Sequence, residues 1–523
     1  MSAEIGACSN PTYQRLCDLK KTGEIGRYGM LFSTQFKNYF YDTGTGKVLH
    51  IGDYEFKTLQ ALFDRTISLE AFEARCRQMG DDRFDKFLAA IEAENLFCAP
   101  PVTTLHLSTD DNWLSLVDTD LQQLVLEVTE ACNFRCKYCI YNEDYDGNRD
   151  FGTAQMSQEV AQRAIDYLAE HSSSHFAVTF YGGEPLVNFP LVRWATEYTL
   201  AHYKDKNPTF NLTTNLTLVT DEIADFLART PGFSIVVSLD GPEEVQNAAR
   251  VYSANKPTFE DAMRGLKTLS KAFKKYDKGL TINSVLIPPY TYEKLDRINN
   301  FFESLDFLPP FTQCMITYPS PGTFPVEDAV ELMSGNSIYE FGSTLNPLVK
   351  WQFKKVQENG LSWKHTRNIY FNTMLKLMET IDGRMVTDTP DDLYHCNGCC
   401  VPGSRKLYVK ASGDLLICER VGSSPVIGNI FTGIDKALLR GKYDTEYVER
   451  SLPACKNCWA VNICPVCYAN CYTENGVDPA EKASECNGVR TQLGMCFRMY
   501  YEILENNPSA LEALKETERS SDG

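Results

Sequence analysis

Three cysteines lie within one short stretch, at Cys132, Cys136 and Cys139. Three residues separate the first two, and two residues separate the last two. Three thiolates from one loop suit an iron–sulfur cluster, because soft sulfur ligands favour such iron sites. A cluster normally has four protein ligands, so three would leave one iron open to bind a substrate or cofactor. On spacing alone, a zinc loop and three unrelated core cysteines remain alternatives.

A second motif lies after a later apolar run. Residues 124–129 and 176–181 predict two strands, and the cysteines follow the first of them. The second strand runs directly into Gly182, Gly183, Glu184 and Pro185. Two motifs in this order, both at strand ends, resemble those of the radical S-adenosylmethionine (SAM) enzymes. Their first motif is C-x3-C-x-aromatic-C, and Tyr138 stands at its aromatic position.

The resemblance implies a 4Fe-4S cluster on the three cysteines, with SAM bound at the open iron. It also implies a contact between the segment 182–184 and the methionine amino group of SAM. One electron from the reduced cluster then cleaves SAM to methionine and a 5′-deoxyadenosyl radical, which abstracts hydrogen from an unactivated carbon. We expect the electron to come from a donor such as flavodoxin or ferredoxin.

Strand and helix patterns alternate six times between residues 119 and 330, which predicts parallel βα units. Strands are expected near 122–129, 176–181, 208–213, 233–240, 279–287 and 312–318. Helices are expected near 157–170, 188–204, 220–229, 258–275 and 291–305, with a sixth after the last strand. Six units are too few for a closed eight-stranded barrel. The resemblance implies an α/β fold with a partial (βα)6 TIM-like barrel, open on one side, whose active groups lie at the C-terminal ends of the strands.

The resemblance also places polar residues near these strand ends against SAM or the substrate. The candidates are Thr213, Asn215, Ser238, Asp240 and Arg250. Ser238 is expected to contact the ribose, and Arg250 to pair the SAM carboxylate as a fork. The alternatives are a strand-end turn for Ser238 and Asp240 and a solvated helix face for Arg250. Relatives often carry His-Asp before the arginine, where this chain has Gln246 and Asn247, so no catalytic acid or base is assigned.

The C-terminal region is rich in cysteine: eleven of the 19 cysteines lie between Cys396 and Cys496. Residues 407–417 predict a hairpin with a Ser-Gly turn. The region resembles the SPASM extension of radical SAM enzymes, in which a cysteine precedes G-x4-C, then C-x2-C-x5-C-x3-C and a last cysteine. One departure is Tyr468, which stands where the last cysteine of the middle run is expected.

The SPASM resemblance implies two auxiliary 4Fe-4S clusters, which makes three clusters in all. We expect the first on Cys400, Cys418 and either Cys471 or Cys467, with Cys396 or Cys399 as a fourth ligand. We expect the second on Cys455, Cys458, Cys464 and Cys486, and Cys496 as a spare thiol in a helix. A pair of zinc sites is the alternative, because paired CxxC spacings suit zinc equally well.

The patterns divide the chain into four expected parts. Residues 1–118 carry short strands followed by helices, which resembles the winged-helix module that binds the leader segment of a precursor peptide in peptide-modifying radical SAM enzymes. A plain cap on the barrel is the alternative for this part. Residues 119–330 are expected to form the radical SAM barrel, 331–392 a helical bridge, and 393–523 the SPASM region.

The composition limits the setting of the protein. The net charge of −18 argues against a nucleic-acid partner, because phosphates repel an acidic surface. No run of roughly 18 apolar residues predicts a membrane span, and the N-terminus lacks the basic and apolar regions of a signal peptide. Nineteen cysteines without such a signal indicate metal-binding or catalytic thiols in the reducing cytoplasm rather than disulfides.

A leader-binding module, an open barrel and a SPASM region together favour a peptide maturase. The hypothesis is a radical SAM oxidoreductase that modifies a ribosomally made precursor peptide by forming thioether bonds at cysteine, as in the maturation of sactipeptides and other Cys-rich peptides. The alternatives are an anaerobic sulfatase-maturating enzyme, which makes formylglycine, and a maturase that joins carbon to carbon. A non-catalytic iron–sulfur carrier or a peptide scaffold would not need the Gly182–Pro185 segment.

Overall fold

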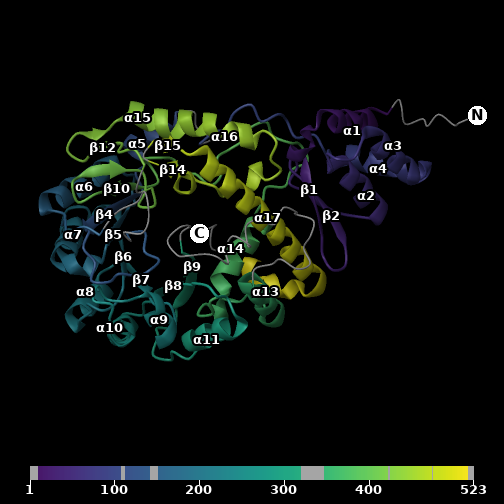
Figure 1. Cartoon of the computed structure of the whole chain (residues 1–523). Coiled ribbons are helices and arrows are strands. Elements are labelled where there is room, and N and C mark those ends of the chain that lie inside the picture. The colour runs from purple at the N-terminus through teal and green to yellow at the C-terminus, as the bar shows by residue number, and fades with distance from the viewer. Residues whose placement is uncertain are drawn as a thin grey trace, which may run out of the picture.

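The computed structural model describes residues 10–107, 112–141, 151–319, 347–421, 424–473 and 475–515. Figure 1 shows a curved sheet with helices on its outer side. A smaller group of helices and strands, formed by the N-terminal residues, lies at the other end of the molecule. Helices of the C-terminal residues run between these two parts.

The curved sheet contains six parallel strands that neighbour one another in chain order, which confirms the six strands predicted from the sequence. They are β4 (Gln123–Thr129), β5 (Ala177–Gly182), β6 (Thr209–Thr214), β7 (Phe233–Ser238), β8 (Thr281–Val285) and β9 (Gln313–Thr317). Because all six run in the same direction, their C-terminal ends lie at one edge of the sheet, where a barrel enzyme carries its site.

The helices between the strands cover the outer side of the sheet (Figure 1). The five predicted helices are α6 (Gln158–His171), α7 (Phe189–His202), α8 (Asp221–Arg229), α10 (Phe259–Lys275) and α11 (Tyr292–Glu303). Ser157 and Thr220 cap the starts of α6 and α8 through their hydroxyl oxygens, which satisfies exposed backbone N–H groups. The short helix α9 (Glu243–Ala249) was not predicted. The sixth helix expected after β9 falls largely on residues 320–346, which lie outside the described residues.

The sheet continues beyond β4 into the C-terminal region. The predicted hairpin forms β10 (Leu407–Val409) and β11 (Asp414–Leu416), and β10 pairs with β4 in parallel. Two short strands, β12 (Gly428–Asn429) and β13 (Gly433–Ile434), extend the sheet to ten strands. The sequence predicted this hairpin but not its pairing with the barrel, because a local pattern of two short strands does not specify a distant partner.

The N-terminal residues have an apolar core of their own. The three predicted strands are present as β1 (Gly29–Ser33), β2 (Asn38–Asp42) and β3 (Val48–Ile51), which form an antiparallel sheet in that order. The helices of this part are α1 (Pro11–Thr22), α2 (Asp53–Phe63), α3 (Leu69–Gln78) and α4 (Asp81–Ala93). Leu16, Leu59 and Phe72 belong to the shared core of these helices and strands.

The remaining helices connect the barrel with the C-terminal region. They are α5 (Leu116–Thr119), α13 (Pro347–Asn359), α14 (Phe371–Asp382), α15 (Lys436–Arg440), α16 (Tyr447–Cys455) and α17 (Pro479–Asn506). Helix α17 lies against both α14 and β1, so it links the end of the barrel to the N-terminal sheet. The strands β14 (Tyr472–Thr473) and β15 (Gly476–Val477) form a small hairpin before it.

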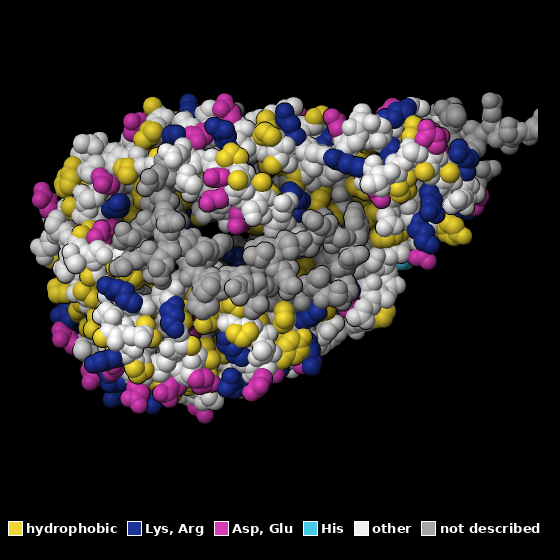
Figure 2. Space-filling view, viewed as in Figure 1, with side chains coloured by type: hydrophobic (Ala, Val, Ile, Leu, Met, Phe, Trp, Pro, Cys, Tyr) yellow, Lys and Arg dark blue, Asp and Glu magenta, His cyan; other side chains and the backbone are white. Residues whose placement is uncertain are grey.

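The surface is of mixed charge. On the face shown in Figure 2, acidic and basic side chains are interspersed with apolar ones and do not form one continuous basic stripe. Within the described ranges, no helix is both long enough and apolar enough to cross a bilayer.

Candidate active site and cluster ligands

Residues 130–141, which we call the Cys loop, follow β4 and carry the three cysteines of the first motif. The backbone of this loop is fixed by the segment that follows α9. The Arg135 N–H donates to the Val251 oxygen at 2.8 Å, and the Lys137 N–H donates to the Ala249 oxygen at 3.0 Å. The loop therefore has a defined conformation although it contains little regular secondary structure.

The three thiols of the Cys loop are partly buried and influence one another. Burial raises the pKa of Cys132 and of Cys136 to about 12, and it raises the pKa of Cys139 as well. The charge of Cys139 adds to the rise at both of the other thiols, while Arg250 opposes it at Cys136. Thiols in this state are protonated at neutral pH, and binding to iron would release their protons.

The two glycines after β5 allow that strand to approach the start of the Cys loop. The Gly183 N–H donates to the Thr129 oxygen at 2.9 Å, and the Glu184 N–H donates to the Ala131 oxygen at 3.0 Å. A Cβ atom on Gly182, whose φ is +134°, would lie 2.0 Å from the Thr129 oxygen. A Cβ atom on Gly183 would lie 2.4 Å from the Ala131 oxygen. No other residue type fits at these two positions without moving the backbone.

Glu184 joins the ends of β5 and β6. Its carboxylate accepts hydrogen bonds from the Asn215 N–H at 2.7 Å, the Thr214 hydroxyl at 2.8 Å and the Leu186 N–H at 3.1 Å. Burial raises its pKa to about 7, although these donors favour the charged form. Glu184 thus holds two strand ends beside the Cys loop.

Asn215 continues this network into the Cys loop. Its side-chain N–H donates to the Asn133 side-chain oxygen at 2.8 Å. Its own side-chain oxygen accepts from the Thr217 hydroxyl at 2.8 Å. The predicted SAM contact at Asn215 is therefore also a link between β6 and the loop that carries the thiols.

Asp240, Tyr138 and Arg250 meet at the end of β7. The Tyr138 hydroxyl donates to one Asp240 oxygen at 2.5 Å, and the Arg250 Nε–H donates to the other at 3.0 Å. The Val285 N–H also donates to Asp240, at 3.0 Å. Burial opposes the charge of Arg250, but Asp240, Tyr138 and Cys136 together outweigh it and hold the pKa of the guanidinium above its usual range. Arg250 is only 7% exposed, so the alternative of a solvated helix face is wrong.

The structure brings most of the predicted SAM contacts to one edge of the sheet. Ser238 is 8% exposed and ends β7, and Thr213 is the penultimate residue of β6. Of these predicted contacts, Glu184, Asn215 and Asp240 are linked to the Cys loop by hydrogen bonds, the last through Tyr138. The sequence did not predict that Tyr138 and Asp240 contact each other, because they lie 102 positions apart.

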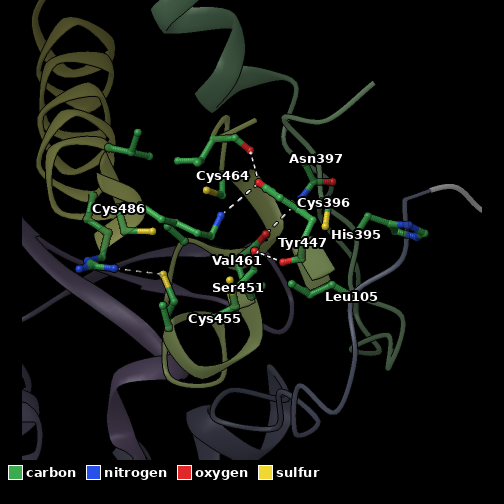
Figure 3. A pocket seen from close by; sticks show the side chains of 17 residues that line it. Leu105, His395, Cys396, Asn397, Tyr447, Ser451, Cys455, Val461, Cys464 and Cys486 are labelled. Atoms are coloured by element: carbon green, nitrogen blue, oxygen red, sulfur yellow. Dashed lines mark hydrogen bonds between the residues drawn. The ribbon is translucent and has the colours of Figure 1, made fainter. Parts of the chain in front are cut away.

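Four C-terminal cysteines surround one cavity. Cys455, Cys458, Cys464 and Cys486, the expected ligands of the second auxiliary cluster, all line it, and so does Cys396. The cavity holds about 550 Å³ of space not filled by atoms, part of it open to solvent. Figure 3 shows the labelled thiols arranged around this space together with Tyr447. Cys455 ends α16, Cys486 lies in α17, and Cys458 and Cys464 lie in the segment between these helices. The four thiols thus converge from three parts of the chain.

A second group of thiols lies next to this cavity. Burial raises the pKa of Cys399 and Cys467; the charge of Cys396 adds to the rise at Cys399, and those of Cys399 and Cys400 add to it at Cys467. Burial raises the pKa of Cys471 to about 12, with contributions from Cys399 and Cys467. The structure thus brings Cys399 and Cys400 near Cys467 and Cys471, and the choice among them as ligands stays a prediction.

Cys418 lies at the end of the hairpin and has polar neighbours. Its sulfur lies 3.3 Å from a Glu419 oxygen and accepts the Arg420 N–H at 3.4 Å. Lys406 pairs with Glu419 at 3.0 Å. The charge of Arg420 also opposes the rise that burial causes in the pKa of Cys467. This neighbour of Cys418 therefore lies near the second group of thiols.

The polar groups beside these thiols fit an anionic cluster. The Tyr468 hydroxyl is buried without a hydrogen-bond partner, and the charges of Cys399 and Cys396 act on it. A buried hydroxyl without an acceptor costs roughly 1–3 kcal/mol, which a thiolate or sulfide acceptor would relieve. In the part of the chain that is described, no three Cys, His, Asp or Glu side chains converge on one point that would hold a single metal ion. A four-iron cluster is larger than one ion, so its ligands lie farther apart than those of a single metal ion.

Comparison with known proteins finds a family similar to the barrel. Residues 126–302 match the radical SAM superfamily. The cysteine-type anaerobic sulfatase-maturating enzyme of Clostridium novyi is 24% identical over 361 residues, which cover 67% of this chain and 87% of that protein. The mycofactocin maturase MftC of Mycobacterium tuberculosis is 33% identical over 150 residues, or 28% of this chain and 34% of that protein.

A solved structure shares the fold. Native anSMEcpe with bound AdoMet and Cp18Cys peptide aligns with a TM-score of 0.51 at 19% identity. The alignment covers 76% of this chain and 99% of that chain. About a quarter of the present chain therefore has no counterpart in that structure.

Proposed function

We propose that this chain is a radical SAM enzyme that modifies a ribosomally made precursor peptide by forming thioether bonds at cysteine. The match of residues 126–302 to that superfamily and the low-identity similarity to an anaerobic sulfatase-maturating enzyme and to a mycofactocin maturase support the proposal. The observation that carries the proposal is the presence of two separate thiol sites. One lies at the C-terminal edge of the barrel, and the other surrounds the cavity of the C-terminal region. A peptide-modifying oxidation needs both a source of the radical and an acceptor for the remaining electron.

The residues of the barrel edge would hold one 4Fe-4S cluster and SAM. Cys132, Cys136 and Cys139 would ligate the cluster, and the backbone of Gly182–Glu184, together with Ser238 and Arg250, would hold SAM. Glu184 and Asn215 keep the strand ends in place around the Cys loop. When bound, the cofactors supply a hydrogen-abstracting 5′-deoxyadenosyl radical.

The C-terminal cysteines would hold two auxiliary 4Fe-4S clusters. Cys455, Cys458, Cys464 and Cys486 would ligate one, around the cavity that they line. The remaining cysteines Cys399, Cys400, Cys418, Cys467 and Cys471 supply candidates for the other. Thioether formation removes one hydrogen from carbon and one from sulfur. The first leaves as a hydrogen atom with the radical and the second as a proton. A cluster held by the C-terminal cysteines would supply the acceptor for the remaining electron.

The N-terminal residues would bind the leader of the precursor. Strand β3 is an edge strand of the antiparallel sheet, and an edge strand can accept an extended peptide as a further strand. This sheet and its helices have their own core. The part of the chain without a counterpart in the sulfatase-maturating structure is large enough to include this module.

Formylglycine formation is a second candidate function. The long alignment with the sulfatase-maturating enzyme of Clostridium novyi, over 87% of that protein, favours it. Both reactions use the same barrel and begin with hydrogen abstraction from a peptide. They differ in whether sulfur is kept in the product as a thioether or lost on conversion of cysteine to formylglycine.

The test uses the anaerobically reconstituted full chain with SAM and dithionite. We expect 5′-deoxyadenosine from the unsubstituted protein and none from the Cys132→Ala variant. Candidate peptides encoded beside the gene are then co-expressed and examined by mass spectrometry after alkylation. A loss of two hydrogens per modified cysteine, with that thiol no longer alkylated, supports thioether formation, whereas formylglycine supports the second candidate. Absence of 5′-deoxyadenosine would exclude both.

A further inference from the structure

A buried lysine lies between the two groups of C-terminal thiols. Lys482, in the first turn of α17, is only 4% exposed and lines the cavity with Cys455, Cys464 and Cys486. Its ammonium donates to the Tyr447 hydroxyl at 3.1 Å and lies 4.3 Å from the centre of that ring. A charged side chain at such a position is unusual, because lysine is almost never fully buried unless it is paired.

Tyr447 extends this contact toward the second group of thiols. Its hydroxyl also contacts the Val466 oxygen at 3.4 Å, and its ring centre lies 4.8 Å from that of Tyr468. The charge of Cys399 acts on both tyrosines. The Cys399 thiol donates to the same Val466 oxygen at 3.9 Å, so Lys482 and Tyr447 connect the cavity with the second group of thiols.

The charge of Lys482 reaches thiols of both groups. It opposes the rise in pKa that burial causes at Cys455, Cys464 and Cys486, which line the cavity. It does the same at Cys399 and Cys471 in the neighbouring group.

No carboxylate neutralises this ammonium. Among the ion pairs of the described residues, none includes Lys482. Glu485, one turn along the same helix, instead accepts a hydrogen bond from Asn470 at 3.3 Å. Burying a cation without a counter-charge costs several kcal/mol of folding free energy, so we expect such a site to bind an anionic group. Thiolate-bound iron–sulfur clusters carry such charge.

We propose that Lys482 is a shared positive charge for the two auxiliary clusters and raises the reduction potential of both. The inference rests on the proposed function, since it requires that the two thiol groups hold clusters. Reduction adds one negative charge to a site that is already anionic. A nearby buried cation stabilises the reduced form more than the oxidised form, and net charge is one of the factors that set cluster potentials. Lys482 would act through the clusters and would not touch the substrate.

The experiment titrates the auxiliary clusters alone. The three cysteines of the Cys loop are replaced by alanine so that only the C-terminal clusters remain, and the full chain is reconstituted under anaerobic conditions. Iron and sulfide are measured per chain, and the clusters are titrated with EPR detection. In the Lys482→Met variant, we expect the equilibrium constant for one-electron reduction to fall at least tenfold for both clusters, or 59 mV for a one-electron couple. Lys482→Arg, which keeps the charge, should shift both potentials much less.

Two control variants separate charge from packing. Lys456 lies between Cys455 and Cys458 but is exposed, so its charge is screened by water, and Lys456→Met should leave both potentials close to those of the parent. Tyr447→Phe removes the hydrogen-bond partner and keeps the ammonium, so it should shift the potentials less than Lys482→Met does.

Each outcome is decisive. Unchanged potentials in a Lys482→Met protein with full iron content would overturn the inference and leave the auxiliary clusters intact. If Lys482→Met loses iron while Lys482→Arg keeps it, the positive charge is needed to hold the anionic clusters, which supports the inference. If Lys482→Arg loses iron as well, the role of Lys482 is packing and not charge, and the inference is wrong. If the parent itself binds no C-terminal clusters, the proposed function fails first, and the inference fails with it.

Discussion

The tight contact between the end of β5 and the start of the Cys loop gives the sharpest test of the site. In Gly183→Ala, the new Cβ would lie 2.4 Å from the Ala131 oxygen, whereas real Cβ contacts are essentially never below 3.0 Å. The backbone must therefore separate by about 0.6 Å at this point. The nearest atom is a backbone oxygen and not the end of a flexible side chain, so no rotamer change relieves the contact.

The cost of this displacement follows from the two hydrogen bonds that cross the contact. The bond from Gly183 to Thr129 would lengthen from 2.9 Å to about 3.5 Å, and that from Glu184 to Ala131 from 3.0 Å to about 3.6 Å. At such lengths a hydrogen bond is lost. Each contributes about 0.5–1.5 kcal/mol net, so we expect a loss of about 1–3 kcal/mol. The population of this loop conformation then falls roughly 5- to 140-fold.

The assay is iron content per chain after anaerobic reconstitution, with 5′-deoxyadenosine formation as the second measurement. To isolate the barrel site, the iron is measured in a protein in which candidate ligands of both auxiliary clusters are replaced by alanine, namely Cys399, Cys400, Cys418, Cys455, Cys458, Cys464, Cys467 and Cys471. Gly183→Ala should lose most of the remaining SAM-dependent activity and iron, while circular dichroism stays close to that of the parent. Gly182→Ala should be at least as severe, since its Cβ would lie 2.0 Å from the Thr129 oxygen and its φ is +134°.

Two glycines elsewhere serve as matched controls. Gly433 has a φ of +87° but no atom within 4 Å of a new Cβ, so Gly433→Ala tests backbone strain alone. Gly441 has open space and no positive φ, so Gly441→Ala tests the substitution itself. If Gly183→Ala kept its iron and activity at the level of Gly441→Ala, the close approach of strand and loop would not position the cysteines.

Three further predictions follow from the same geometry. Asp240→Asn leaves the buried Arg250 without its anion and should destabilise the chain by about 3–5 kcal/mol in denaturant unfolding; a loss below about 1 kcal/mol would contradict a buried ion pair. Burial raises the pKa of Glu184 from 4.5 to about 7, so the native state should lose stability as pH rises across that interval. The Glu184→Gln variant lacks this titration, so between about pH 5.5 and 8 the free energy of unfolding of the parent should fall by about 2 kcal/mol relative to that of the variant. Parallel pH profiles of the two proteins would refute the shift. Cys464→Ala should lower iron by about four atoms per chain, and Cys496→Ala, a buried thiol away from the cavity, by none; equal losses would contradict the ligand assignment.

The sequence predicted those features that depend on local pattern. The six barrel strands and the helices between them are amphipathic or apolar runs of ordinary length, and their alternation alone implies parallel units. The cysteines around the cavity are grouped by the resemblance to the SPASM extension and not by spacing alone. The structure brings Cys455, Cys458 and Cys464 to one space, and the start of α17 carries Cys486 there as well.

The features that the sequence did not predict depend on contacts between distant residues. The bond from Tyr138 to Asp240 joins a loop to a strand end 102 positions later. Lys482 looks like a surface residue in the sequence, since it stands in the polar run Pro479–Cys486 at the start of a helix. Only the packing of α17 against α16 makes it a buried cation. A charged residue four positions before a cysteine that is predicted to be a ligand, on the same face of a helix, is the signal that could have identified it.

The pairing of β10 with β4 bears on how the two thiol sites are held relative to each other. Strand β4 leads directly into the Cys loop, and β10 opens the hairpin between Cys400 and Cys418. The two strands pair in parallel, and the buried Glu127 of β4 accepts hydrogen bonds from the Tyr408 hydroxyl at 2.5 Å and the Ala411 N–H at 3.2 Å.

A backbone ladder and a buried carboxylate therefore connect the two sites. If electrons pass between a radical formed at the barrel edge and a cluster of the C-terminal region, their separation must be constant, and this shared sheet provides that constancy. Tyr408→Phe, which removes the hydrogen bond from Tyr408 to Glu127 and leaves every cysteine in place, should therefore keep full iron content. It should also lower peptide modification more than it lowers 5′-deoxyadenosine formation. An equal fall in both would mean that the sheet connection only stabilises the fold.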